Sequence, residues 1–162
     1  MVTWAEICAD PVLQNLPYKI ETNRFGKIMM SPASFWHGGF EIEIGHLLKQ
    51  LMQGGRAVAE CAIKTTDGIR VADVAWISRE RYEPHRKAIS LPIAPEICVE
   101  IISSSNTKEE MLSKMQLYFS AGAKETWLCD EDGNMEFYHS ASVAPIPQSV
   151  LCPLFPVKVV LD

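Results

Sequence analysis

The sequence lacks the long apolar segments of membrane proteins and the leader of exported ones. No apolar run approaches the ~20 residues that a membrane-spanning helix needs. The N-terminal segment MVTWAEICAD contains no basic stretch followed by an apolar one, which is the pattern that directs export. We therefore expect a cytoplasmic protein without a membrane partner. Internal repeats, low-complexity tracts and linkers are also absent, so residues 1–162 are expected to form one domain.

The sequence also lacks cysteine pairs with the spacing of a metal site. The five cysteines are scattered, and none lies in a C-x-x-C arrangement. Because zinc sites and disulfide frameworks rely on regularly spaced cysteines, we expect neither a thiol ligand nor a disulfide. Cys61, Cys98 and Cys129 lie in strand patterns, where a thiol fills space as a small hydrophobic group.

An excess of positive charge is lacking as well. The net charge of −5 argues against attraction of nucleic acid to the whole surface. It leaves room for a local basic patch or a metal-bridged phosphate site. The segment 79–87, RERYEPHRK, holds five basic positions, and we interpret it as an exposed loop. Such a loop, with Tyr82 in it, either contacts backbone phosphates or is simply solvated.

The patterns that are present predict an α/β (α+β) fold with a central mixed sheet flanked by helices. Apolar residues at helical spacing alternate along the chain with short apolar runs bounded by turn residues. Ser34 is a candidate N-cap, Thr107 and Glu110 have the spacing of a capping box, and Gly122 follows the expected end of that helix. We expect helices at 3–8, 35–53 and 107–121, and strands at 18–22, 26–30, 56–65, 71–77, 97–102, 125–129, 134–139 and 155–161.

Two of the expected strands carry a carboxylate inside an apolar run. Asp73 lies in RVADVAWI and Glu100 in EICVEIIS, where an unpaired charge loses hydration worth several kcal/mol. If the strands pair, the two side chains lie ~5–6 Å apart, and both cannot stay ionised in a dry site. A shared Mg²⁺ or Mn²⁺ would resolve the conflict. Alternatively, one carboxylate lies at a sheet edge or pairs with Arg70.

Lys114 lies at the border of the apolar face that Met111, Met115 and Tyr118 form on the helix at 107–121. Two interpretations are open. The ammonium group either pairs with Glu110 one turn earlier, as in an ordinary exposed helix, or turns inward toward the two carboxylates.

Several segments, taken in order, resemble the PD-(D/E)xK nuclease superfamily, and specifically its small bacterial family of restriction-endonuclease-like proteins. The resemblance covers most of the chain from Tyr18 to Tyr138 and implies a restriction-endonuclease-like fold. Its most specific part runs from Pro95 to Asp130. The matching pieces are IETNRFGKIMMSPAS (20–34), His37, VADVAWIS (71–78) and APEICVEIISSSNTKEEMLSKMQLYFSAGAKETWLCD (94–130).

The resemblance also implies roles for individual residues. Asp73 matches the metal-binding aspartate and Glu100 the acidic residue of the central strand. Lys114 matches a catalytic lysine that this family carries on the following helix, and Glu21 matches an accessory acidic position. Mg²⁺ or Mn²⁺ would then be held by Asp73, Glu100 and the backbone carbonyl of Ile101. His37 and Glu110 match recurrent polar positions without an assigned role.

The activity that the resemblance implies is metal-dependent hydrolysis of phosphodiester bonds in DNA by an endonuclease. A homodimer is also expected, with Trp36 and Phe40 either at its interface or covering the core. One alternative is a degenerate module that binds nucleic acid or assembles as a dimer, because Ile102 stands where the superfamily usually has its lysine. The acidic balance and the short chain also favour this module. A second alternative is a metal-dependent hydrolase for a smaller phosphoester.

Overall fold

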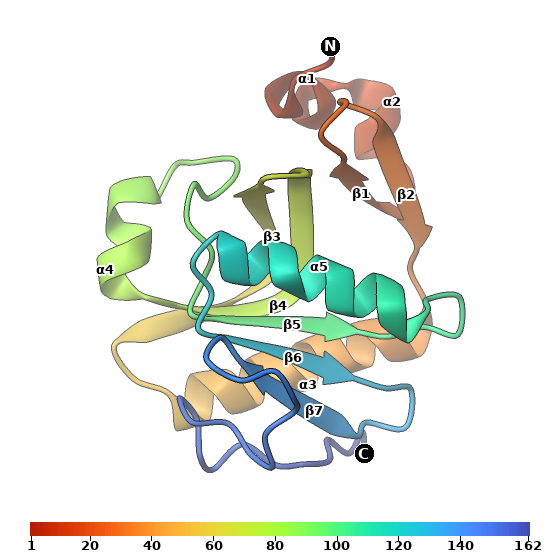
Figure 1. Cartoon of the computed structure of the whole chain (residues 1–162). Coiled ribbons are helices and arrows are strands. Elements are labelled where there is room, and N and C mark those ends of the chain that lie inside the picture. Colours follow the sequence, from red (N-terminus) through yellow and green to blue (C-terminus); the bar gives the residue numbers. More distant parts are fainter.

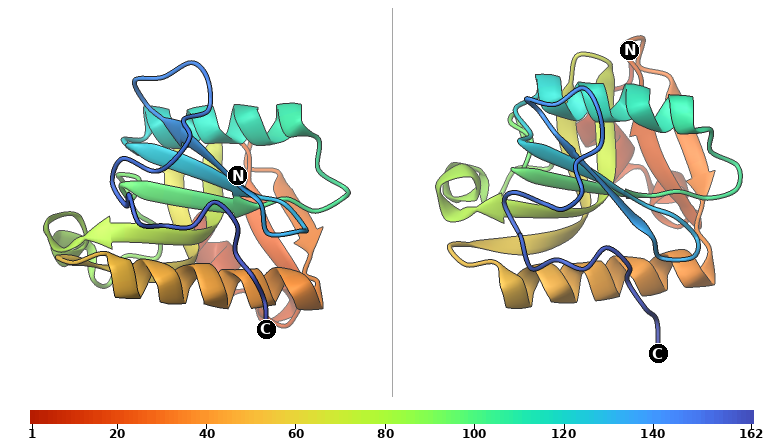
Figure 2. Two further views of the ribbon diagram at one scale, coloured as in Figure 1. Left: turned by 90° about the horizontal axis from the view of Figure 1, so that it is seen from below. Right: turned by 60° about the horizontal axis from the view of Figure 1, so that its bottom comes forward.

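A five-stranded sheet lies between two long helices, and a separate two-stranded hairpin stands beside it (Figure 1). The computed structural model describes residues 1–162. Helix α3 (Phe35–Leu51) covers one face of the sheet and α5 (Lys108–Ser120) covers the other, as the views in Figure 2 show. In spatial order the strands are β3 (Gly55–Thr65), β4 (Gly68–Ser78), β5 (Ile97–Ile101), β6 (Glu125–Cys129) and β7 (Met135–His139).

The sheet is mixed, because β5 and β6 run parallel and every other neighbouring pair is antiparallel. This arrangement confirms the predicted α+β class with helices on both faces. The central strand β5 is buried on both faces, as its nearly continuous apolar run indicated. Val99 packs into the core under α3, whereas Cys98 packs with Tyr118 on the α5 side. Strand alternation therefore directs Glu100 toward α5.

Both long helices begin at the predicted caps. The hydroxyl of Ser34 accepts a hydrogen bond from the backbone N–H of His37 at the start of α3. Thr107 and Glu110 form a reciprocal capping box at the start of α5. Gly122 follows α5 with a φ of 108°, a left-handed conformation that ends helices at low cost only in glycine. These signals fix where α5 begins and ends in the chain, so that the helix starts near the C-terminal end of β5.

The hairpin consists of β1 (Tyr18–Thr22) and β2 (Ile28–Pro32), and β1 lies against β4. Its Thr22 end is attached to the β3–β4 hairpin by side-chain contacts. The contacting pairs are Glu21 with the backbone N–H of Val71, Thr22 with the backbone N–H of Ile69, and Arg24 with Asp67.

The β3–β4 hairpin bends at one point. Glu60 is the one non-glycine residue with a positive φ, 50°, and it lies opposite Asp73 in the β3–β4 register. On β4, the two residues that flank Asp73 pack on opposite faces of the sheet. Val74 packs under α3, whereas Ala72 packs in the cluster on the α5 side. The β4–β5 ladder stops at the pair Val74–Val99. At this bend Asp73 is thus absent from the ladder pairs with both neighbouring strands.

The segment 79–87 is mostly exposed, as predicted, but much of it is helical and not a loop. It contains α4 (Arg79–Tyr82) and the 3-10 helix η1 (Glu83–His85). The hydroxyl of Ser78 caps α4 by accepting from the N–H of Arg81. The Arg81 guanidinium in turn donates to the backbone carbonyls of Ala94 and Gly122. These partners are distant in sequence, so the local pattern could not reveal them.

The strand predicted at 155–161 is also wrong. The chain after β7 is irregular, and its only β-type pairing with the sheet is at the isolated bridges Asn134–Lys158 and Phe137–Ile146. Cys152, Phe155 and Val159 of this segment pack into the core. Pro153 and Pro156 remove backbone donors from this segment, which disfavours a regular ladder.

Trp36 and Phe40 both contact the core, but only Phe40 is buried. Phe40 is a buried member of the core, and Trp36 packs against that core. The structure therefore supports the core-covering alternative for Phe40, whereas a place for the half-buried Trp36 at a dimer interface stays a prediction.

The N-terminal segment forms two short helices, α1 (Trp4–Ala9) and α2 (Pro11–Gln14). The helix predicted at 3–8 corresponds to α1. Asp10 caps α2, and Pro11 occupies its first turn, where no backbone donor is needed. No helix of the chain combines the length and apolar character required to span a membrane.

Candidate active site

Asp73 and Glu100 lie on adjacent strands at the bend of the sheet. The β4–β5 register, continued by one residue beyond the Val74–Val99 pair, sets them opposite each other. Their exposed fractions are only 1% and 3%. Because burial of an unpaired charge costs several kcal/mol, the partners of these two carboxylates decide what the site can do.

Lys19 of β1 lies between the two carboxylates. Its Nζ is 2.6 Å from Oδ1 of Asp73 and 3.5 Å from Oε2 of Glu100. Burial raises the pKa of Asp73, but Lys19 and His37 outweigh it and hold that pKa well below its usual range. Burial dominates at Glu100 and raises its pKa despite Lys114 and Lys19. The ammonium group therefore compensates a buried charge that would otherwise be unstable.

Lys114 of α5 approaches the site from the other side. Its Nζ lies 3.0 Å from Oε1 of Glu100 and 2.8 Å from Oε1 of Glu21, and it donates to the carbonyl of Val71. The inward orientation that we weighed against pairing with Glu110 is thus the one observed. Glu110 is occupied by the capping box instead.

Glu21 links the hairpin to the site. Burial raises its pKa, but Lys114 and Lys19 outweigh that effect and lower the pKa overall. The carboxylate also accepts the backbone N–H of Val71 at 2.7 Å. The structure therefore brings together all four side chains that the sequence singled out for catalysis, namely Glu21, Asp73, Glu100 and Lys114.

His37 at the start of α3 contacts the other oxygen of Asp73. Its Nε2 lies 3.4 Å from Oδ2 of Asp73, and its Nδ1 lies 3.1 Å from Oε1 of Glu41. Hydrogen bonds to Asp73 and Glu41 raise the pKa of His37 to about 10. His37, Glu41 and Asp73 each offer one ligand atom, and these atoms lie within 4.8 Å of one another. This group has the donor atoms of a divalent-cation site.

Glu60 adds a further carboxyl group at the bend. Partial burial raises its pKa to about 7, and a hydrogen bond with Glu41 adds to the effect. A positive φ in a non-glycine residue costs of order 1–3 kcal/mol and persists only where the surrounding structure enforces it. Such residues concentrate at functional sites, and this one lies opposite Asp73.

Neutral donors orient both central carboxylates. The Tyr118 hydroxyl donates to Oε1 of Glu100 at 2.6 Å, and the backbone N–H of Ile101 donates to Oδ2 of Asp73 at 2.7 Å. Ile102 packs against an apolar cluster under α5, so the position of the usual superfamily lysine contributes no charge. The ammonium groups come from β1 and α5 instead.

Sequence reasoning missed Lys19, Glu41 and Tyr118. A signal for each was present. Lys19 precedes Glu21 by two residues, so strand alternation puts both on one face of β1. Glu41 and Tyr118 follow His37 and Lys114 by four residues, the spacing at which helical side chains meet.

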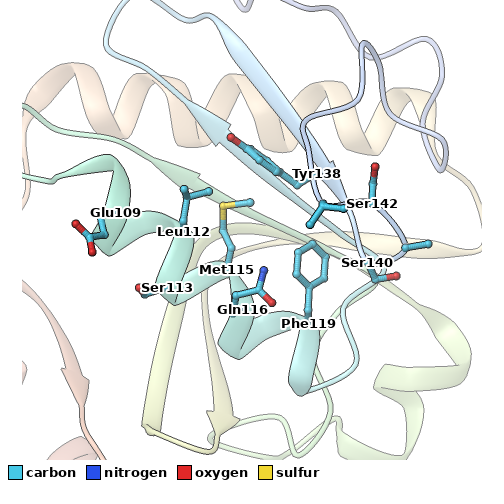
Figure 3. A pocket seen from close by; sticks show the side chains of 11 residues that line it. Glu109, Leu112, Ser113, Met115, Gln116, Phe119, Tyr138, Ser140 and Ser142 are labelled. Carbon is cyan, nitrogen blue, oxygen red and sulfur yellow. The ribbon is translucent and has the colours of Figure 1, made fainter.

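A separate groove of about 560 Å³ lies on the outer side of α5, between that helix and the end of β7. Figure 3 shows the largely apolar side chains Leu112, Met115, Phe119 and Tyr138 along it. None of the lysines and carboxylates described above lines it, so this groove is not part of the site.

Comparison with known proteins supports the fold and the family. One solved structure, titled "Crystal structure of a putative nuclease belonging to DUF820 from Anabaena variabilis ATCC 29413", is similar to the chain with a TM-score of 0.73 and 17% sequence identity. The match covers 98% of this chain and 95% of the other. No curated protein matches the chain. The model of the Uma2 family, described as "Putative restriction endonuclease", matches residues 8–154. With this match over most of its length, and with the restriction-endonuclease-like fold described above, the chain belongs to the Uma2 family.

Proposed function

We propose that this chain is a metal-dependent endonuclease that hydrolyses phosphodiester bonds in DNA. The observation that carries the proposal is the pair of buried carboxylates, Asp73 and Glu100, held opposite each other with two ammonium groups against them. Membership of the Uma2 family supports nuclease activity. The substrate and the metal are part of the proposal.

The residues present fit a divalent cation. An ammonium group already lies within reach of both Asp73 and Glu100, so a cation suits the space between them. The N–H of Ile101 faces Asp73, and the carbonyl of a strand residue faces the same neighbour as its N–H. Asp73, Glu100 and the Ile101 carbonyl would therefore hold the metal, with His37 and Glu41 as candidate ligands on the Oδ2 side of Asp73. Bound Mg²⁺ or Mn²⁺ supplies positive charge that polarises the phosphate and acidifies a water molecule.

The protein's own groups would do the remaining work. Lys114 is held by Glu21 and Glu100 at a defined point, from which its ammonium would orient the attacking water or stabilise charge on the phosphate in the transition state. Tyr118 would keep the Glu100 carboxylate in place. Glu21 acts as the accessory acid that positions Lys114.

The test is a cleavage assay on supercoiled plasmid DNA with Mg²⁺, with Mn²⁺ and with EDTA. We expect nicking only with metal, and its loss in Asp73→Asn and Glu100→Gln with folding retained by circular dichroism. Glu131→Gln, at an exposed position outside the site, is the matched control. Metal-independent cleavage, or full activity of Asp73→Asn, would contradict the proposal.

The same assay separates the alternatives. Binding of DNA without cleavage under any metal would indicate a degenerate module, which the apolar Ile102 favours. Preference for a small phosphodiester over both DNA and RNA would indicate the smaller substrate. The expected homodimer is tested by light scattering, where a monomer mass at all concentrations would reject it.

A further inference from the structure

Lys19 occupies the point at which a cation shared by Asp73 and Glu100 would lie. Its Nζ is 2.6 Å from one carboxylate and 3.5 Å from the other, and its side chain is only 13% exposed. An ammonium group and a divalent metal cannot occupy this point at the same time, because both need the same carboxylate oxygens and they repel each other. We propose that Lys19 is an internal cation that competes with the metal, so that metal loading requires its ammonium group to leave. This inference deepens the proposed function and rests on its metal site.

Lys114 does not play the same part. It uses the other oxygen of Glu100, Oε1, and is held in addition by Glu21 and by the carbonyl of Val71. It makes no ion pair with Asp73, whereas Lys19 pairs with both carboxylates. Of the two lysines, Lys19 is therefore the one that occupies the expected position of the metal.

The hairpin allows Lys19 to move. Its Thr22 end is tied down by Glu21 and Thr22, whereas Tyr18 at the other end is exposed. Every polar contact of the Lys19 side chain is with Asp73 or Glu100. A lysine stem is flexible, so the ammonium group can swing out while the hairpin stays attached. Lys19 thus stabilises the metal-free protein and sets the metal concentration at which the site fills.

The experiment measures Mn²⁺ binding by titration calorimetry and thermal unfolding with and without Mn²⁺. The variants are Lys19→Met, Asp73→Asn and Lys108→Met. Lys108→Met is the control, because the exposed Lys108 pairs with Glu136 away from the site. We expect Lys19→Met to bind Mn²⁺ at least about tenfold more tightly than the parent, because the ion pairs of Lys19 with Asp73 and Glu100 no longer have to be broken before the metal binds. Its melting temperature should be lower than that of the parent without metal and should rise more when Mn²⁺ is added. Lys108→Met should match the parent.

Equal or weaker Mn²⁺ binding by Lys19→Met would overturn the competition. Unchanged affinity with lost cleavage would also overturn it and make Lys19 a catalytic residue. If Asp73→Asn binds Mn²⁺ as tightly as the parent, the metal site of the proposed function fails instead. Should Lys19→Met not fold without metal, Lys19→Gln keeps a donor to Asp73 without the charge and carries the same expectation.

Discussion

At the scale of single residues, charge compensation explains why one small domain tolerates buried carboxylates. Asp73 has Lys19 and His37 beside it, Glu100 has both lysines and the Tyr118 hydroxyl, and each carboxylate is thereby paired. Removing one partner of a buried ion pair is strongly destabilising. The structure therefore links the stability of the metal-free protein to the same residues that we propose for catalysis.

Lys114→Met should abolish Mg²⁺-dependent cleavage. The variant removes the ammonium group that lies 3.0 Å from Glu100. Loss of one group that stabilises charge in the transition state typically costs 10²–10³-fold, or about 3–4 kcal/mol, in the rate. The measurement is plasmid nicking under single-turnover conditions, with circular dichroism as the check on folding.

Lys108→Met on the same helix is the control for that variant. Its lysine is exposed and pairs with Glu136, so the nicking rate should stay at the parental value. If Lys114→Met cleaves as fast as Lys108→Met, Lys114 has no part in the reaction.

The stability that His37 gives to the metal-free protein should be lost as the pH rises above neutral. The hydrogen bonds to Asp73 and Glu41 raise its pKa from 6.5 to about 10. Between these values the folded state binds more protons than the unfolded state, so the free energy of unfolding falls as pH rises. The stabilisation is complete below pH 6.5 and is lost as the pH passes through about 10. Urea denaturation in EDTA should show this slope in the parent and a flatter one in His37→Asn. Equal slopes would mean that His37 is not held protonated.

At the scale of secondary-structure elements, the hairpin β1–β2 matters because it carries Lys19 and Glu21. The hairpin packs against the turn between β3 and β4. Gly68, which follows that turn as the first residue of β4, has a φ of 84°, and a Cβ there would lie 2.3 Å from the carbonyl oxygen of Thr22. A side chain at this position would therefore strain the turn and push the hairpin away from β4.

Gly68→Ala should destabilise the protein more than Gly54→Ala does. Gly54 has a similar φ of 77°, but nothing lies within 4 Å of a Cβ built there. Gly54→Ala thus reports only the left-handed strain, about 1–2 kcal/mol, and Gly68→Ala adds the clash with Thr22. Urea denaturation measures the difference, and the nicking assay should show reduced activity for Gly68→Ala alone. Equal losses of stability would mean that the hairpin is not seated on Gly68.

At the scale of the whole molecule, one buried carboxylate closes the irregular C-terminal segment onto the sheet. Glu125 of β6 is fully buried. It accepts hydrogen bonds from the indole of Trp127, the hydroxyl of Ser149 and the backbone N–H groups of Val150 and Leu151. No lysine or arginine pairs with it, so neutral donors alone compensate its charge. The tail is therefore held by this carboxylate, together with apolar contacts of Phe155 and Val159 in the core, and not by a regular strand.

Glu125→Ala should lower the free energy of unfolding by about 3–5 kcal/mol, because it leaves several buried donors without an acceptor. Limited proteolysis should then cut within residues 141–154, where the parent resists. Glu131→Ala, at an exposed position, is the control and should leave both measurements unchanged. A stable Glu125→Ala variant with a protected tail would show that apolar packing holds this segment.

The sequence by itself determined the elements whose signals are local. The bounds of β1 and β6 and the caps of α3 and α5 agree with the pattern, because alternation and capping act within a few residues. The sequence also predicted that Asp73 and Glu100 lie opposite each other if their strands pair, and the β4–β5 register supplies that pairing. The prediction of a single domain over residues 1–162, and the roles of the site residues, stay predictions.

Only the tertiary structure decided which cations meet these carboxylates. Lys19 reaches Asp73 across 54 positions of the chain, and Arg81 of α4 is anchored by the carbonyls of Ala94 and Gly122. The tail likewise depends on Glu125 rather than on its own pattern. An ion pair or hydrogen bond between distant segments leaves no periodic trace in either of them. Its energy enters only once the fold has brought the two groups out of water and within contact of each other.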